Sequence, residues 1–199
     1  MRILRAGAHA QVPWKNGLGV SQVLATQPAG AGYDTLDWQV ASTAFAADCP
    51  FSSLRGLDRQ FMLIEGAGVE LSCSDPRERV DLKLCVDAPC VVHAFSGDWR
   101  TECRMLGGGV RVLNVITRRG RVGARVEAPR FTGALPLVQA PGETLVAVLL
   151  EGLAEIDGVQ PGLAALDGVL LDDPQGARID LRSRGAAVRI AVVRIFAAP

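Results

Sequence analysis

The stretch FMLIEGAGVELS, residues 61–72, indicates how the chain folds. An apolar run leads to Glu-Gly, and the residues beyond the glycine alternate between apolar and polar, as in a half-buried strand. A second stretch, LVAVLLEGLAEID at residues 145–157, repeats this order. We interpret both as β-hairpins. Their repetition predicts an internal duplication into two β-barrel halves.

Short strand-like runs separated by turn signals occupy most of the remaining chain, and no amphipathic helix of eleven or more residues is evident. Many short strands at regular spacing predict an all-β sandwich or barrel. The Pro- and Gly-containing segment 130–143 is interpreted as a linker, which gives approximate halves 1–129 and 130–199 of one compact unit. The predicted strands lie at 19–27, 37–45, 59–66, 68–74, 89–95, 100–106, 110–117, 123–128, 144–152, 153–158, 177–183 and 186–196.

The composition is that of a folded protein with no electrostatic bias. The chain has 199 residues, 49% of them hydrophobic, and a formal net charge of zero. A substantial core is therefore expected, and no global field attracts the protein to nucleic acid or to a membrane. The five cysteines are odd in number and form no C-x-x-C pair, so neither a disulfide framework nor a zinc site is expected. The absence of a long apolar run leads us to expect a cytoplasmic protein.

Metal and cofactor chemistry has little support in the sequence. Only two histidines occur, His9 and His93, with no H-x-H pair, so a His-rich metal centre is not expected. The sequence contains no G-x-S-x-G, P-loop or strand-associated G-x-G-x-x-G motif, and we expect no cofactor. His93 lies in an apolar run, where a core histidine is favoured over a ligand.

Arginine is concentrated between residues 100 and 130, where eight arginines face two acids. This pattern fits either a solvated face or a site for an anion, since arginine forms bidentate bonds to carboxylates. A nucleic-acid groove would need aromatic residues among the charges, but only Trp99 and Phe131 flank the segment. We therefore expect no nucleic-acid partner.

Two further stretches place polar residues next to turns. PWKNGLG, at 13–19, sets Trp14 and one of only two lysines, Lys15, beside an Asn-Gly turn. PFSSLRGLDR, at 50–59, brings a hydroxyl and a guanidinium into a loop that enters a strand. Taken alone, this second stretch fits loop capping and a surface arginine as well as it fits a binding site.

These stretches, with FSGDW at 95–99 and LNVITRRG at 113–120, resemble the HutD/Ves family in order and spacing. The resemblance covers about residues 11–120 and implies a bicupin, which consists of two double-stranded β-helices of the cupin or jelly-roll type. It also implies a small-molecule-binding or regulatory protein associated with histidine utilisation, with a ligand resembling N-formylglutamate or formate. The chain departs from the family pattern at Leu18, Val112 and Ile116, where Gly, Asp and Met are usual.

The resemblance implies a ligand site at a barrel mouth. The PWKNG turn would place cationic and amide groups around a carboxylate beside an apolar wall, and residues of other strands would converge on the same space. Arg118 is preferred to Arg119 because neighbouring strand residues face opposite sides. The predicted site residues are Trp14, Lys15, Asn16, Phe51, Ser52, Arg59, Asn114 and Arg118.

Three functions are compatible with this sequence. The leading hypothesis is a non-catalytic bicupin that binds a small carboxylate and modulates histidine utilisation or related amino-acid catabolism. The alternative is a metal-independent cupin enzyme, an isomerase or lyase, whose acid or base would be His93, Asp98 or Lys15. The third is an interaction module. The apolar run 187–196 fits either pairing across a homodimer or a buried central strand.

Overall fold

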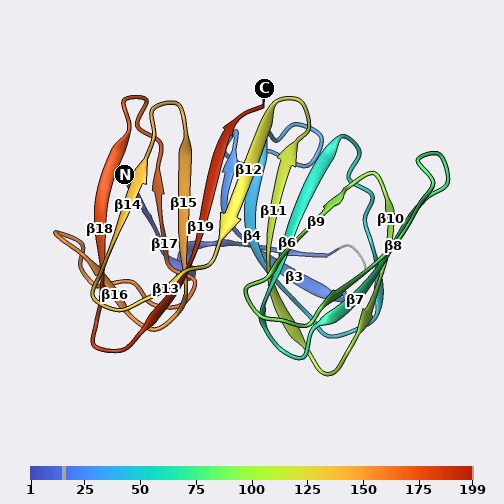
Figure 1. Ribbon diagram of the computed structural model, residues 1–199, viewed down its shortest axis with the longest axis horizontal. Coiled ribbons are helices and arrows are strands. Elements are labelled where there is room, and N and C mark those ends of the chain that lie inside the picture. The colour runs from blue at the N-terminus through green and yellow to red at the C-terminus, as the bar shows by residue number, and fades with distance from the viewer. Residues whose placement is uncertain (15–16, 199) are drawn as a thin grey trace. The chain divides into compact units, whose positions relative to one another are not determined.

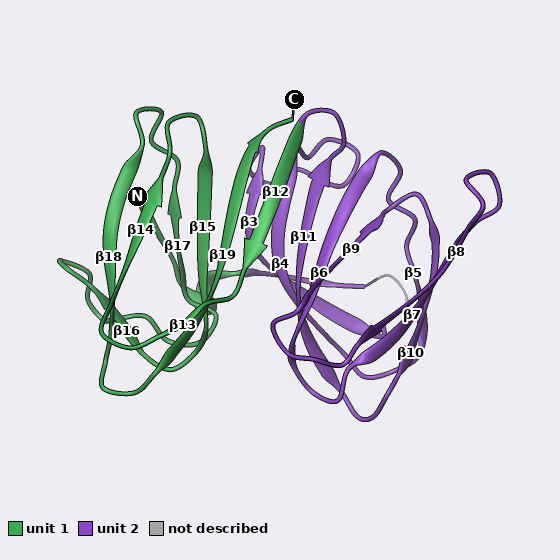
Figure 2. Ribbon diagram, in the orientation of Figure 1, with its two compact units in different colours: residues 1–9, 122–199 green, residues 10–121 purple. Residues whose placement is uncertain are grey.

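The computed structural model describes residues 1–14 and 17–198, and almost all of its regular structure is strand. The one helix in the described ranges is a 3₁₀ turn at Ala6–Ala8. The chain divides into two compact units, residues 10–121 and residues 1–9 with 122–199 (Figures 1 and 2). The prediction of an all-β fold is confirmed.

The unit formed by residues 10–121, here called the middle unit, consists of two antiparallel sheets. One sheet has the strand order β2-β3-β4-β11-β6-β9, and the other has the order β5-β10-β7-β8. Its strands are β2 (Ala10–Pro13), β3 (Gly19–Gln27), β4 (Trp38–Phe45), β5 (Cys49–Phe51), β6 (Leu57–Glu65), β7 (Val69–Asp75), β8 (Val80–Val86), β9 (Val92–Ser96), β10 (Arg100–Met105) and β11 (Val110–Arg118).

The other unit, here called the terminal unit, contains both ends of the chain. Its larger sheet has the order β1-β17-β15-β19-β12, with β13 also on β19, and its smaller sheet has the order β14-β18-β16. Its strands are β1 (Arg2–Leu4), β12 (Val122–Glu127), β13 (Arg130–Phe131), β14 (Ala134–Gln139), β15 (Thr144–Glu151), β16 (Ala154–Ile156), β17 (Gly168–Leu171), β18 (Ala177–Ser183) and β19 (Val188–Ala197).

The two units repeat one topology. In the middle unit β6 lies between β11 and β9, and β10 lies between β5 and β7; in the terminal unit β15 lies between β19 and β17, and β18 lies between β14 and β16. The chain visits these strands in the same order both times. The internal duplication suggested by the two Glu-Gly stretches is therefore present in the strand order.

The Glu-Gly stretches themselves are corners and not hairpins, which corrects the sequence interpretation. Strand β6 belongs to one sheet and β7 to the other, and β15 and β16 are divided in the same way. Each corner follows a register shift in the ladder, one next to Glu65 and one next to Glu151. Such a bulge bends a strand and increases its twist, so that the chain can leave one sheet and enter the other.

Each corner is held in the same way. The Glu65 carboxylate lies 3.6 Å from Arg111 Nε, and that of Glu151 lies 3.9 Å from Arg189 Nε. The glycine that follows has a positive φ, 102° at Gly66 and 90° at Gly152. These are backbone conformations that side chains with a Cβ rarely adopt.

The division between the units lies closer to the N-terminus than the halves 1–129 and 130–199 predicted from sequence. The boundary falls between Arg121 and Val122, because β12 pairs with β19. The first nine residues also belong to the terminal unit, since β1 pairs with β17. The predicted linker 130–143 instead contains β13 and β14. Pro136 is tolerated there because β14 is an edge strand, where a missing N–H breaks no ladder bond.

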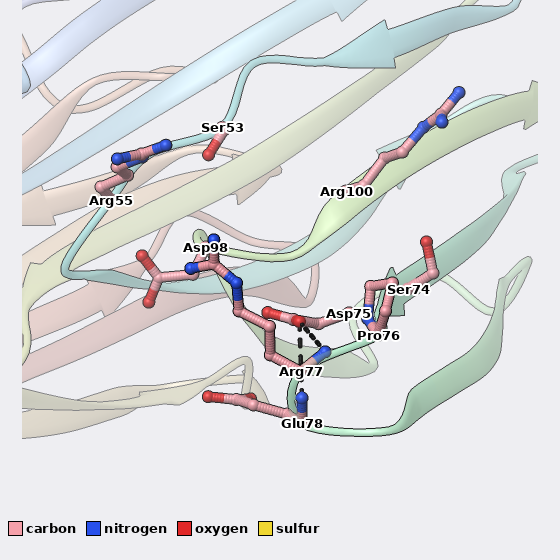
Figure 3. Close-up of a pocket in the computed structure, with 9 residues that line it drawn as sticks. All are labelled: Ser53, Arg55, Ser74, Asp75, Pro76, Arg77, Glu78, Asp98 and Arg100. Atoms are coloured by element: carbon pink, nitrogen blue, oxygen red, sulfur yellow. Dashed lines mark hydrogen bonds between the residues drawn. The ribbon is translucent and has the colours of Figure 1, made fainter.

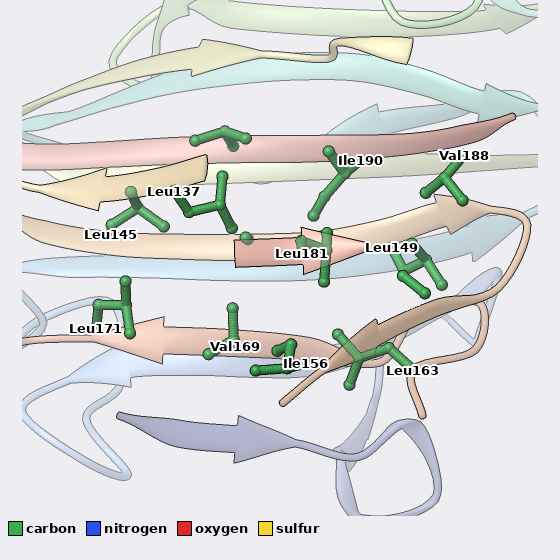
Figure 4. Packing of buried hydrophobic residues seen from close by; sticks show 13 residues of the cluster. Leu137, Leu145, Leu149, Ile156, Leu163, Val169, Leu171, Leu181, Val188 and Ile190 are labelled. Carbon is green, nitrogen blue, oxygen red and sulfur yellow. The ribbon is translucent and has the colours of Figure 1, made fainter. Parts of the chain in front are cut away.

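The core of the terminal unit is mainly aliphatic, with Gln139 and Asp167 as its buried polar residues. Leu145, Leu149, Leu181 and Val188 are fully buried and pack between its two sheets (Figure 4). The run 187–196 contributes β19, which lies between β15 and β12. A buried central strand therefore accounts for its composition.

Gly66→Ala is expected to destabilise the protein by more than about 1 kcal/mol, since a left-handed backbone is strained in any residue with a Cβ. The added Cβ would also collide with the backbone of Gly109 and Val110. Gly107→Ala is the control, because an added Cβ there makes only ordinary contact, 3.4 Å from Ala67. Urea unfolding measures both variants, and equal losses of stability would contradict the argument.

Candidate functional site

The interior of the middle unit contains a buried arginine. Arg59 on β6 lies opposite Phe95 on β9 and Ile116 on β11, and only 8% of its surface is exposed. The guanidinium carbon lies 4.8 Å from the ring centroid of Phe51 and 5.0 Å from that of Phe95. These contacts are cation–π interactions, which offset part of the cost of burial.

The charge of Arg59 has no counter-ion in the described part of the chain. No salt bridge there involves Arg59, and its Nε is buried without a hydrogen-bond partner. Burial lowers the pKa of this guanidinium to about 10, so it still carries its charge at neutral pH. A buried charge without a partner is strongly unfavourable, and most proteins avoid one. Arg59 is therefore suited to receive an anion.

Aromatic rings continue from the arginine across the barrel. Phe51 contacts Phe61 at a centroid distance of 5.7 Å and Phe45 at 6.0 Å, and Trp14 lies 5.2 Å from Phe45. Trp14 also donates its indole N–H to Ser21 Oγ at 3.1 Å, and Ser21 Oγ lies 3.0 Å from Thr43 Oγ1. These polar groups of the interior are satisfied by one another, unlike Arg59.

Asn114 is the second unsatisfied group of this interior. It lies on β11 between Phe61 of β6 and Ala41 of β4, and 8% of its surface is exposed. Its Oδ1 is buried and has no hydrogen-bond partner. Arg59 and Asn114 thus present a free N–H donor and a free C=O acceptor from neighbouring strands.

Three thiols lie in the core of the same unit, those of Cys49, Cys73 and Cys103. Burial raises the pKa of Cys49 and of Cys73, which accepts a hydrogen bond from Thr101 Oγ1 at 3.7 Å, and raises that of Cys103 to about 12. All three thiols are protonated at neutral pH and are therefore weak nucleophiles. They form part of the apolar lining.

The terminal unit serves as an internal comparison, because its strands repeat those of the middle unit. Leu63 pairs with Val112 beside one register shift, and Leu149 pairs with Ile190 beside the other. Counting outward from these pairs, the position of Arg59 is occupied by Leu145 and that of Asn114 by Val192; both are core residues. The fold itself therefore requires neither polar group.

The structure brings together only some of the predicted site residues. Trp14, Phe51, Arg59 and Asn114 belong to the middle-unit interior described above. Ser52 is exposed in the loop after β5. Lys15 and Asn16 lie outside the described residues.

The two adjacent arginines at the end of β11 have different partners. Arg118 donates to the backbone carbonyls of Leu36 at 2.7 Å and Tyr33 at 2.9 Å, so its guanidinium holds a loop. Arg119 forms ion pairs with Asp58 at 2.7 Å and Asp98 at 2.6 Å. Asp98 also accepts the Gly56 N–H at 2.8 Å, which ties the loop before β6 to the loop after β9. Sequence alternation alone could not identify these partners.

A surface pocket of about 530 Å³ lies near this network (Figure 3). The acidic side chains that line it are already engaged: Asp75 accepts backbone N–H groups of its own turn, Glu78 accepts the indole N–H of Trp99, and Asp98 binds Arg119. Most of the pocket's lining residues are polar or charged, and the unsatisfied groups described above are not among them. It is lined by Ser53, Arg55, Ser74, Asp75, Pro76, Arg77, Glu78, Asp98 and Arg100.

Of the candidate acids and bases for catalysis, Asp98 and His93 belong to the described residues, and they lie in different parts of the middle unit. Asp98 lines the surface pocket, and the Gly56 N–H and the Arg119 guanidinium lower its pKa, which favours the ionised form. His93 lies on β9, opposite Phe61. Within residues 1–14 and 17–198, no three His, Cys, Asp or Glu side chains are grouped as metal ligands, and no helix is long and apolar enough to cross a membrane.

Asp98→Asn is expected to lower stability at neutral pH but to lose this effect in acid. A carboxyl whose folded pKa is lowered stabilises the fold above its unfolded pKa, near 3.8, and that contribution disappears as the pH falls through the folded pKa. Urea unfolding at pH 7 and pH 2.5 (about one unit below the unfolded value) measures the difference. Asp81→Asn, at an exposed carboxylate of β8, is the control. A wild-type advantage that persists unchanged in acid would refute the assignment.

The sequence of the chain is similar to that of a curated protein. A curated relative, an uncharacterized 21.2 kDa protein in the hutC 3′ region of Pseudomonas putida, is 30% identical over 127 residues, which is 64% of this chain and 63% of the relative. The chain thus spans somewhat less than two thirds of the relative's length.

Solved structures resemble the chain over nearly its whole length. A conserved protein of unknown function from Pseudomonas aeruginosa is 26% identical with a TM-score of 0.83, and the match covers 98% of both chains. HutD from Pseudomonas fluorescens is 23% identical with a TM-score of 0.77, covering 100% of this chain and 99% of that one. The oxalate decarboxylase of Lactobacillus farciminis shares the fold alone, with 9% identity, a TM-score of 0.71 and coverage of 96% and 85%.

These likenesses agree with the repeated strand order, and the fold is that of the cupins. A sequence model of the family described as HutD matches residues 6–189. With the motifs around Trp14, Arg59 and Asn114 inside that span, the chain belongs to the HutD family.

Proposed function

We propose that the middle unit binds a small carboxylate inside its barrel, with Arg59 as the anion-binding residue. The observation that carries this proposal is the buried Arg59 guanidinium, whose Nε lacks a partner and which no described carboxylate neutralises. An incoming anion would supply the missing charge and the missing acceptor together. Charge-assisted hydrogen bonds of this kind are about twice as strong as neutral ones.

A carboxylate fits this environment better than a more highly charged anion. The interior offers one guanidinium among aromatic rings, and its remaining described polar groups are neutral. A guanidinium binds a carboxylate through two parallel N–H···O bonds, in which one positive charge meets one negative charge. In phosphate, both negative charges lie on the one group beside the single guanidinium, so one of them would be buried without a partner. In an acid such as N-formylglutamate, the second carboxylate lies several bonds away from the group that Arg59 would bind.

The relatives indicate a biological setting for this binding. The curated relative lies in the hutC 3′ region, and the HutD structure from P. fluorescens is described as a formate condition. In line with the family resemblance, the ligand that we propose is a carboxylate resembling formate or N-formylglutamate, and the proposed role is to modulate histidine utilisation or related amino-acid catabolism. The protein would bind this ligand without converting it.

Replacing Arg59 by methionine is expected to abolish carboxylate binding without loss of stability. Methionine fills the space with an apolar chain, and removing an unpaired buried charge relieves an unfavourable interaction. A ligand at a hundred times its Kd stabilises the wild type by about 2.7 kcal/mol. Calorimetry with formate, acetate and N-formylglutamate measures binding, and urea unfolding measures stability.

The control is Arg104→Met, which removes an exposed arginine of β10 that lies 3.5 Å from Glu70. Its carboxylate binding is expected to equal that of the wild type. Carboxylate binding that survives in Arg59→Met would exclude the proposed site. If none of the three carboxylates bound the wild type, the proposed ligand class would be wrong.

A further inference from the structure

Asn114 points to a second feature of the ligand. We infer that the ligand carries an N–H or O–H donor close to its carboxylate, and that Asn114 Oδ1 accepts this donor while Arg59 binds the carboxylate. The ligand class is thus a small acid with an amide-type or ring N–H, and a bare carboxylate such as formate satisfies only half of the site. This inference rests on the proposed function.

The amide oxygen of Asn114 has no hydrogen-bond partner among the described residues. The two residues directly opposite it, Ala41 and Phe61, have no side-chain donor, and its diagonal neighbours Gln39 and Thr43 do not bond to it. A buried acceptor left unpaired costs about 1–3 kcal/mol, and nearly all such groups in proteins find a partner. The nearby Trp14, Ser21 and Thr43 do so within the barrel. Asn114 is therefore an exception that a ligand would resolve.

The two unsatisfied groups are placed to contact one small molecule. Arg59 on β6 lies opposite Ile116 on β11, and Asn114 lies two residues from Ile116 on β11. Paired residues and residues two apart share a face of the sheet, so the side chains of Arg59 and Asn114 project from the same face. Diagonal neighbours of this kind lie about 7–8 Å apart in a sheet. A carboxylate at the guanidinium would leave room for a donor a few bonds away to reach the amide oxygen.

The terminal unit supports the pairing of these two residues. Leu145 and Val192 occupy the equivalent positions, and both pack in the apolar core of that unit. The donor and the acceptor are thus both present in one barrel and both absent from the other.

Two probes that differ in a single group test the inference. N-acetylglycine carries an amide N–H next to its carboxylate arm, and acetoxyacetate has an ester oxygen in place of that N–H. Calorimetry is carried out on the full chain with both compounds and with acetate. The wild type is expected to bind N-acetylglycine about tenfold more tightly than acetoxyacetate, the effect of one satisfied buried hydrogen bond.

Asn114→Val introduces the residue type found at the equivalent position of the terminal unit. This variant is expected to bind N-acetylglycine and acetoxyacetate equally, within about twofold, because the N–H of N-acetylglycine then finds no acceptor at this position. Circular dichroism and urea unfolding establish that the variant is folded. A folded variant that keeps the tenfold preference would assign the discrimination to another residue and overturn the role of Asn114.

The outcomes separate this inference from the proposed function. If the wild type binds both probes equally and Arg59→Met binds neither, the carboxylate site stands and the requirement for a donor is refuted. If the wild type binds neither probe nor acetate, the carboxylate site is refuted, and the donor requirement with it.

Discussion

The passage of the chain from one sheet to the other at Glu-Gly is the constraint on which the architecture depends. At both corners a register shift precedes the glutamate, an arginine of the adjacent strand pairs with it, and the glycine takes a positive φ. Without these corners, β6 and β7, or β15 and β16, would continue as flat hairpins. Each barrel interior exists because the chain turns there.

The repeated topology then separates what the fold needs from what the middle unit adds. The terminal unit fills the interior with aliphatic side chains, the ordinary solution for a closely packed core. The middle unit places aromatic rings, a guanidinium and an amide in the corresponding space. The same strand order forms around either set of core side chains. The fold therefore does not require the buried polar groups of the middle unit, which lower its stability.

Much of the fold could be predicted from local patterns, and the failures have identifiable physical causes. Strands Gly19–Gln27 and Ala177–Ser183 form with the boundaries expected from their composition. The corners were interpreted as hairpins because periodicity shows strands and turns but not which sheet each strand joins. The segment containing Pro136 was interpreted as a linker because composition does not reveal that a strand lies at an edge. The sequence motifs at 50–59 and 113–120 indicated Arg59 and Asn114 as site residues. That both lack hydrogen-bond partners could not be predicted, because it depends on which strands, far apart in the sequence, surround them.

The way in which the middle unit is inserted into the terminal unit affects how its interior, which contains unsatisfied polar groups, stays folded. The terminal unit is formed from both ends of the chain, and β1 and β12 begin and resume it on either side of the middle unit. Residues 10–121 are thus an insertion, and both of their ends continue into the terminal unit, whose core is mainly aliphatic. An insertion whose ends continue into ordered strands loses less by fraying than a free terminus does. Tethering at both ends thus favours an ordered middle unit despite the unsatisfied polar groups in its interior.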